Sequence, residues 1–164
     1  MRRLIVSLAL ALVLVASFAV PAFAATTADV TVTATPAFVG IENSPDNFNF
    51  ETVVANTDED TTETYFTLTN VSNVAVNTTI ACTVWSGTRS WAYGAAGADT
   101  GQLEFTFDGS SYTVVPAPPA SAVTFKDDIA AYGTQSWGLQ LDTPTSFTHG
   151  YQQTTTVTIT ASAG

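Results

Sequence analysis

The sequence is poor in the residues that most catalytic and metal sites use, with one Cys, one His and one Met among 164 residues. A single cysteine excludes a disulfide within the chain, and Cys82 lies in an apolar stretch, where we interpret it as a small buried hydrophobe. His149 is the only histidine, so any histidine-based triad would have to use it. It lies in a turn, where we interpret it as a surface residue. We therefore predict a protein that is not an enzyme and needs no cofactor, with an enzyme that uses carboxylates alone as a weak alternative.

Basic residues are also scarce, because four Lys and Arg stand against fourteen Asp and Glu, for a net charge of −10. Binding to phosphates needs a cationic face, so nucleic acid is excluded as a natural partner. Arg2 and Arg3 precede an apolar run over 4–20 that ends in a small-x-small pattern. This order predicts a signal peptide over 1–24, a mature domain over 25–164 with a charge of −12, and a secreted or cell-surface location without a membrane contact after cleavage. An uncleaved N-terminal anchor is the alternative.

Threonine, by contrast, is abundant, with 29 residues, and it alternates with apolar residues along several segments. Period-two alternation is typical of strands with one face in a core and one in water, and the β-branch of threonine favours an extended backbone. Only residues 125–132 allow a helical turn. The pattern predicts an all-β fold, a single antiparallel immunoglobulin-like sandwich of about seven to nine strands. Eight strands are expected, at 28–35, 48–54, 63–70, 74–84, 103–107, 111–115, 134–141 and 153–161.

The inward side of these strands predicts the core, because the larger apolar residues recur at every second position. The long segment 85–101, with its Gly and Trp residues, is expected to be an irregular loop. The residues assigned to the core are Phe66, Leu68, Cys82, Trp137, Leu139, Val157 and Ile159.

Two segments carry a resemblance to a known family. The stretch Asn47-Phe48-Asn49-Phe50-Glu51-Thr52-Val53, followed by Phe66-Thr67-Leu68-Thr69-Asn70-Val71-Ser72, resembles the core of Hydin-like immunoglobulin-type modules. The ending from Leu141 to Thr160 is similar to their last two strands. Glu51 stands where a Gly often occurs in those modules, and the long loop has no counterpart there. The resemblance implies a β-sandwich used in adhesion, scaffolding or assembly and supplies no functional residues.

Candidate ligand sites are few. Trp85, Trp91 and Tyr93 surround the long loop and form a candidate platform for stacking on sugar rings, which would make polysaccharide a partner. The acidic run Asp58, Glu59 and Asp60 offers oxygens to calcium but lacks the spacing of a calcium loop, so a solvated loop is favoured. Regular rows of threonine also fit an ice-binding array, but an ordinary solvated sheet face gives the same spacing. The pattern for N-glycosylation occurs at Asn70 and Asn77.

Two functions are weighed from these features. The first is a secreted structural subunit of a surface layer, filament or sheath, whose partners are copies of itself or other surface proteins. The second is a secreted carbohydrate-binding or adhesion module that uses the aromatics of the long loop. For the first, the segment 28–35 carries a stripe of Val30, Val32 and Ala34 with no charge from Val30 onward. Such a strand can pair within its own sandwich, which short-range closure favours, or complete the sheet of a neighbouring copy.

Overall fold

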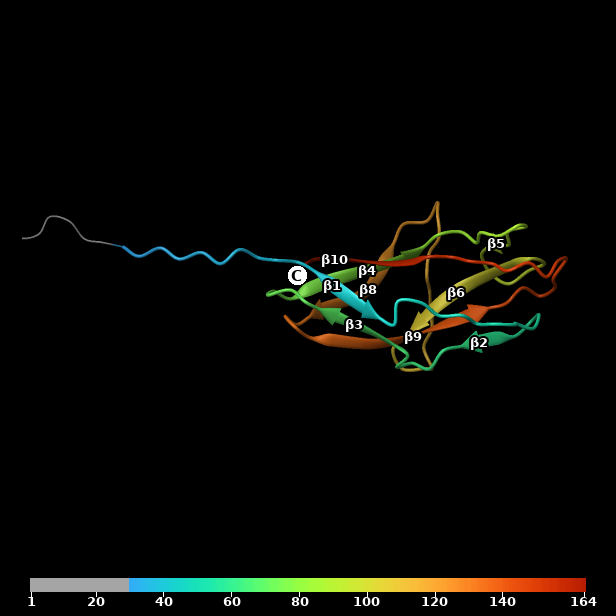
Figure 1. Ribbon diagram of the computed structural model, residues 1–164, viewed down its shortest axis with the longest axis horizontal. Coiled ribbons are helices and arrows are strands. Elements are labelled where there is room, and N and C mark those ends of the chain that lie inside the picture. Colours follow the sequence, from blue (N-terminus) through green and yellow to red (C-terminus); the bar gives the residue numbers. More distant parts are fainter. Residues whose placement is uncertain (1–29) are drawn as a thin grey trace, which may run out of the picture. The chain divides into compact units, whose positions relative to one another are not determined.

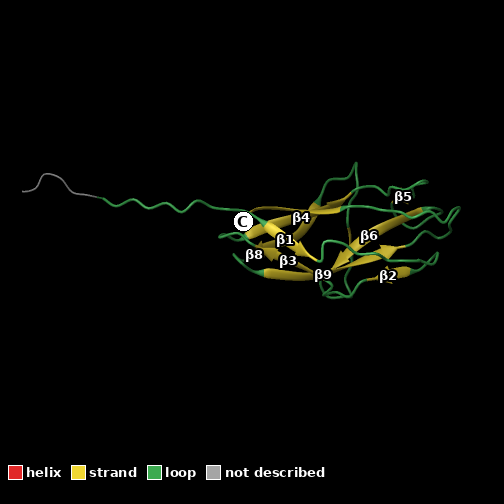
Figure 2. Ribbon diagram, in the orientation of Figure 1, coloured by secondary structure: helices red, strands yellow, loops and turns green. Residues whose placement is uncertain are grey.

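The computed structural model describes residues 30–164, and these form strands, turns and loops without a helix (Figure 2). Residues 36–164 form one compact unit, and residues 1–35 are assigned to a separate unit, of which 30–35 are described. The signal peptide predicted over 1–24 lies outside the described residues. Within 30–164 the structure contains no helix long and apolar enough to cross a membrane. The ten strands are β1 (Ile41–Ser44), β2 (Asp58–Asp60), β3 (Phe66–Asn70), β4 (Val76–Cys82), β5 (Ala92–Tyr93), β6 (Thr100–Thr106), β7 (Thr113–Val114), β8 (Val123–Ile129), β9 (Thr134–Asp142) and β10 (Val157–Ala163).

The strands form two sheets that pack against each other (Figure 1). One sheet has seven strands, with the order β1-β3-β9-β6-β5, while β2 pairs with β9 and β7 with β6. The other has three, in the order β10-β4-β8. All pairs are antiparallel except β5 with β6, which is parallel because the chain from 94 to 99 loops back before β6 begins. The all-β prediction is therefore confirmed, and the prediction of a wholly antiparallel arrangement is wrong at this pair.

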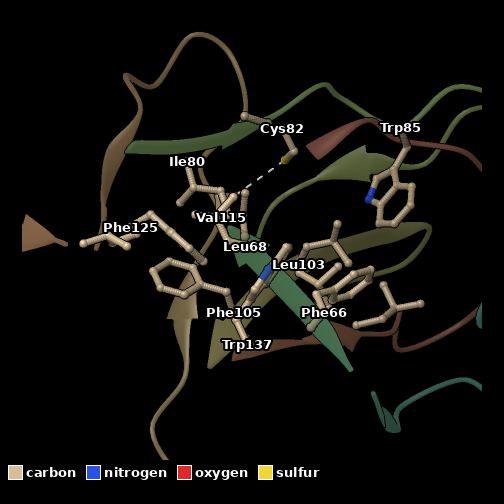
Figure 3. Close-up of a cluster of buried hydrophobic side chains, with 14 of the residues drawn as sticks. Phe66, Leu68, Ile80, Cys82, Trp85, Leu103, Phe105, Val115, Phe125 and Trp137 are labelled. Carbon is tan, nitrogen blue, oxygen red and sulfur yellow. Dashed lines mark hydrogen bonds between the residues drawn. The ribbon is translucent and has the colours of Figure 1, made fainter. Parts of the chain in front are cut away.

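Side chains from both sheets meet in one core (Figure 3). Trp137 on β9 is 2% exposed, stacks on Phe66 at 4.5 Å between ring centroids, and meets the edge of Phe125 on β8 at 5.2 Å. Because Phe125 belongs to the three-stranded sheet, these rings join the two layers. The predicted core residues Phe66, Leu68, Cys82, Trp137 and Leu139 are all buried.

The other two residues predicted as core, Val157 and Ile159 on β10, face inward but are only half-buried. They lie on an edge strand that pairs with β4 alone among the described strands, so one of their sides is left uncovered. The prediction is right about the face of the strand and wrong about the degree of burial. The partial exposure of Val157 and Ile159 shows that the core is not fully covered beside β10.

Three predicted elements are wrong. Residues 30–35 of the expected strand 28–35 lie in no strand, and Val30 and Val32 are 81% and 84% exposed. The expected strand 48–54 is a loop, because Glu51 adopts a positive φ of 59° in a turn held by the Asn49 side chain. The helical turn expected at 125–132 is instead the end of β8 and the tight turn that follows it.

Candidate functional site

A groove with a volume of about 1080 Å³ lies between an edge of each sheet. On one side it is lined by β1 and the loop 46–53, and on the other by β10 and the segment 147–156. Its apolar interior consists of core side chains of the seven-stranded sheet, namely Phe66, Leu68, Leu103, Trp137, Leu139 and Leu141. This volume is slightly above the range of about 300–1,000 Å³ that is usual for ligand sites. The sandwich thus has an opening that leads directly to its core.

The free edge of β10 presents unpaired backbone groups at its inward-facing residues. The Thr83 N–H donates to the Thr156 C=O at 2.9 Å, which makes this a hydrogen-bonded pair of the β4–β10 ladder. Bonded and non-bonded pairs alternate in an antiparallel ladder, so Val157, Ile159 and Ala161 occupy non-bonded positions. Their N–H and C=O groups therefore point away from β4, toward the open edge, while their side chains face the core.

The edge of β1 follows the same rule. The Val71 N–H donates to the Gly40 C=O at 3.0 Å, so the next pair of the β1–β3 ladder, Ile41 with Asn70, is not hydrogen-bonded. Ile41 and Asn43 consequently direct their backbone groups outward as well, and both side chains are half-buried. Both edges of the groove can accept a further strand. β10 offers the longer edge, with seven residues against four.

The segment before β1 leaves the compact unit at a fixed point. The Phe38 N–H donates to the Asn73 Oδ1 at 2.8 Å, and the Asn73 Nδ2 donates to the Pro36 C=O at 3.0 Å. The hydroxyl of Ser72, which is buried, donates to the Gly40 C=O and accepts from its N–H. Residues 36–40 are thereby held against the turn between β3 and β4. Residues 30–39 are all exposed and lie outside any strand, including all three members of the Val30, Val32 and Ala34 stripe.

The aromatic residues of the long loop do not form the exposed platform that the sequence suggests. Trp85 and Trp91 are 7% and 8% exposed, and the Trp85 Nε1 donates to the Gly101 C=O at 2.9 Å. The Tyr93 hydroxyl donates to the Val115 C=O at 2.5 Å, and burial is the main cause that raises its pKa. These side chains fasten the loop to β6 and to the chain after β7. The expectation of an exposed aromatic platform is wrong because the polar atoms of Trp85 and Tyr93 bond inward.

Two side-chain nitrogens at one end of the groove are buried without a hydrogen-bond partner among the described residues, the Trp91 Nε1 and the His149 Nδ1. Both residues line the groove. A buried polar group without a hydrogen-bond partner lowers the free energy of unfolding by about 1–3 kcal/mol, so this end of the groove is a locally unfavourable part of the unit. His149 lies beside Tyr151, with ring centroids 5.5 Å apart.

Cys82 is buried, and its thiol lies 3.7 Å from the Val115 C=O (Figure 3). Burial raises the pKa of this thiol, so little thiolate forms at neutral pH. The interpretation of Cys82 as a buried hydrophobe is confirmed. Asn70 is fully buried as well and uses its side-chain amide for three internal hydrogen bonds, so the folded protein leaves no access for glycosylation at this position. Asn77 on β4 is half-buried.

The acidic run proposed for calcium forms β2. Alternation along the strand leaves Asp58 and Asp60 exposed on one face and puts the half-buried Glu59 on the other. Within the described part of the chain, no three His, Cys, Asp or Glu side chains come together in a way that could hold a metal ion. The geometry therefore offers no support for the calcium site weighed from the sequence.

A row of carboxylates does cross the outer face of the seven-stranded sheet. In the ladder Asp58 lies opposite Asp142, and Gln102 and Glu104 on β6 lie on the other side of β9. Partial burial, followed by the charges of Asp142 and Asp58, raises the pKa of Glu104. Ionised Glu104 therefore lowers the free energy of unfolding at a pH above this raised pKa. Below the ordinary pKa of 4.5, the side chain is protonated in both states and the cost disappears.

Replacing Glu104 with glutamine is expected to raise the melting temperature at pH 7, because it removes this charge and keeps a partner for Gln102. The difference from the unsubstituted protein should vanish as the pH falls below 4.5. Thermal unfolding followed by circular dichroism over this pH range measures both effects. Glu42→Gln on the exposed side of β1 is the control for removing one charge from an acidic chain. An equal rise in that variant would contradict a local origin.

A scan of protein-family models and searches of curated proteins and of solved structures give no match to this chain. The groove, its two edges and the exposed segment 30–35 are the features of the chain that bear on its function. Sequence reasoning identified the segment through its Val30, Val32 and Ala34 stripe but missed the groove. The available signal was the alternation of apolar residues along β10. This alternation shows which face of the strand is apolar, but it does not show whether a neighbouring strand covers that face.

Proposed function

We propose that the protein is a secreted, non-enzymatic structural subunit that assembles on the cell exterior with copies of itself. In this proposal residues 1–24 are the signal peptide, and the body is an immunoglobulin-like sandwich of the kind that the Hydin-like resemblance implies. The subunits are joined by strand exchange through residues 28–35. The observation that carries the proposal is the exposure of the stripe: Val30 and Val32 are 81% and 84% exposed and belong to no strand.

Energetic considerations support assembly over an isolated monomer. Burying an exposed valine side chain contributes about 1.5–3 kcal/mol, so the two valines alone offer a substantial gain to any arrangement that covers them. Backbone groups in 30–35 have no strand partner, and an added strand would supply one for each. A carbohydrate-binding module is the weaker candidate, because Trp85 and Trp91 are buried and leave no flat aromatic surface.

Deleting residues 25–35 is expected to abolish polymers of the secreted protein, because the deletion removes the donor strand and leaves the compact unit 36–164 intact. Negative-stain microscopy and light scattering after size exclusion measure the assembly. Circular dichroism checks that the truncated unit is folded. Polymers of unchanged form from the truncated protein would refute strand exchange, and a monomer retained on a polysaccharide gel would favour the alternative.

A matched pair of variants tests the stripe without shortening the chain. Val30→Asp with Val32→Asp puts two charges on the apolar side of the segment and is expected to prevent assembly. Thr31→Asp with Thr33→Asp adds the same charge on the opposite side, because successive side chains of a strand alternate. Assembly should survive in the second variant. Equal loss in both would point to general charge repulsion and against a stripe that is buried in the polymer.

A further inference from the structure

We infer that the groove between β1 and β10 is the acceptor site, and that it takes the segment 30–35 of a second copy as a strand antiparallel to β10. This inference rests on the proposed function and adds to it where the segment binds and in which direction. The groove belongs to the compact unit, while the stripe belongs to a segment that is exposed and unpaired. The groove has an open strand edge, and the segment has backbone groups without a strand partner.

The match is first one of spacing. Three inward-facing residues of β10, namely Val157, Ile159 and Ala161, have backbone groups that point to the open edge and side chains that are half-buried. The donor stripe also has three apolar residues at every second position. A strand laid along β10 would bond at all three positions and place its stripe beside the half-buried side chains. Since 30–35 contains no charged residue, the donor brings none into an apolar groove.

Direction and register follow from the same ladder. Antiparallel pairing is the more stable per residue, so the donor runs opposite to β10. Centring the two stripes places Val32 opposite Ile159. A slip of one residue would turn threonines into the groove and valines to water, so it is disfavoured. With this register Thr33 lies opposite Thr158, and because that pair is not hydrogen-bonded its side chains are close together on the outer face.

Cross-linking between two single-cysteine variants tests this arrangement. A copy with Thr33→Cys is mixed with a copy that carries Thr158→Cys, and the polymers are oxidised and analysed on a non-reducing gel. A disulfide needs Cα atoms within about 4.4–6.8 Å, which directly opposed strand residues satisfy. We expect the disulfide-linked dimer to form about tenfold faster than with Thr160→Cys, the position that a parallel donor would reach from Thr33. A rate for Thr160→Cys that is equal or higher overturns the antiparallel register.

Two controls fix the location. Thr124→Cys lies on β8, the opposite edge of the same sheet, and is exposed, so it samples random collisions at a matched threonine. The unsubstituted chain controls for Cys82, which is buried. Cross-links to Thr124→Cys as fast as those to Thr158→Cys overturn the acceptor site. A double variant, Thr33→Cys with Thr158→Cys, that closes within one chain at low concentration overturns the second copy as the occupant.

The outcomes separate this inference from the proposed function. If the unsubstituted protein polymerises and loses polymers on deletion of 25–35, strand exchange stands. If Thr33→Cys then fails to link to Thr158→Cys within those polymers, the segment is donated to another edge and the inference is wrong. If no polymers form at all, the proposed function itself fails.

Discussion

Replacing Asn70 with alanine is expected to lower the free energy of unfolding by about 3–5 kcal/mol, because it removes the hydrogen bonds that one backbone N–H and three backbone carbonyls make with this buried side chain. Asn70 ends β3 and is fully buried. Its Nδ2 donates to the carbonyls of Val74, Ile129 and Ala130 at 2.9–3.0 Å, and its Oδ1 accepts from the Ser72 N–H at 2.8 Å. One side chain thus holds the turn after β3 against the end of β8.

Asn70→Asp separates the hydrogen bonds from the volume of the side chain. The carboxylate has the same shape but places an acceptor oxygen where the Nδ2 donated to three carbonyl oxygens, so at neutral pH it should destabilise the fold at least as much as alanine does. Urea unfolding followed by circular dichroism measures both variants. Asn73→Ala is the control in the same turn, because the two hydrogen bonds that it removes, to Pro36 and Phe38, are exposed to water, and a loss within about 1 kcal/mol is expected there. A similarly small loss in Asn70→Ala would contradict the role of Asn70.

Much of the fold was predictable wherever a strand has one dry face and one wet face. The alternation in β3, β4 and β9 reports the local environment directly, and Phe66, Leu68 and Trp137 are buried as expected. The pattern fails in β8, whose exposed side chains include Lys126 and two aspartates, and whose pairing with β4 contains register shifts. An irregular edge strand buries too few residues to show a period of two.

Loops were predicted less well, because contacts between distant parts of the chain decide them. Phe48 and Phe50 alternate like strand residues and do face inward, meeting each other at 4.8 Å, but Glu51 turns the backbone away from any ladder. Trp85 and Trp91 are buried because β6 and residues 147–153 cover them, and nothing in their own neighbourhood of the sequence indicates this.

One part of the candidate site was predictable from the sequence and the other was not. The donor stripe is local, so the sequence displays it in full. The groove arises because no described strand covers the inward face of β10 on its open side, and that depends on where every other strand lies. A sequence predicts which faces are apolar more readily than it predicts which apolar face is left uncovered.

Trp137→Ala is expected to lower the free energy of unfolding by about 3–5 kcal/mol, the usual cost of removing a large aromatic ring from a packed core. Trp137 is stacked on Phe66 and contacts Phe125 across the two sheets, so its loss opens a cavity where the layers join. Its Nε1 also donates to the Asn43 Oδ1 at 2.9 Å, which ties β9 to β1 at the edge of the groove. A loss below about 1 kcal/mol would contradict this packing.

Trp137→Phe keeps an aromatic ring and removes the hydrogen bond to Asn43, so a smaller loss of about 1–2 kcal/mol is expected. Trp91→Phe is the matched control, because Trp91 is also buried but its Nε1 has no partner among the described residues, so that variant loses no hydrogen bond. Urea unfolding measures both variants. Together with Asn43→Ala and the double variant Trp137→Phe with Asn43→Ala, it completes a double-mutant cycle for the Trp137–Asn43 hydrogen bond. A coupling between the two sites near 1 kcal/mol is expected, and its absence would show that β1 is held to β9 by packing alone.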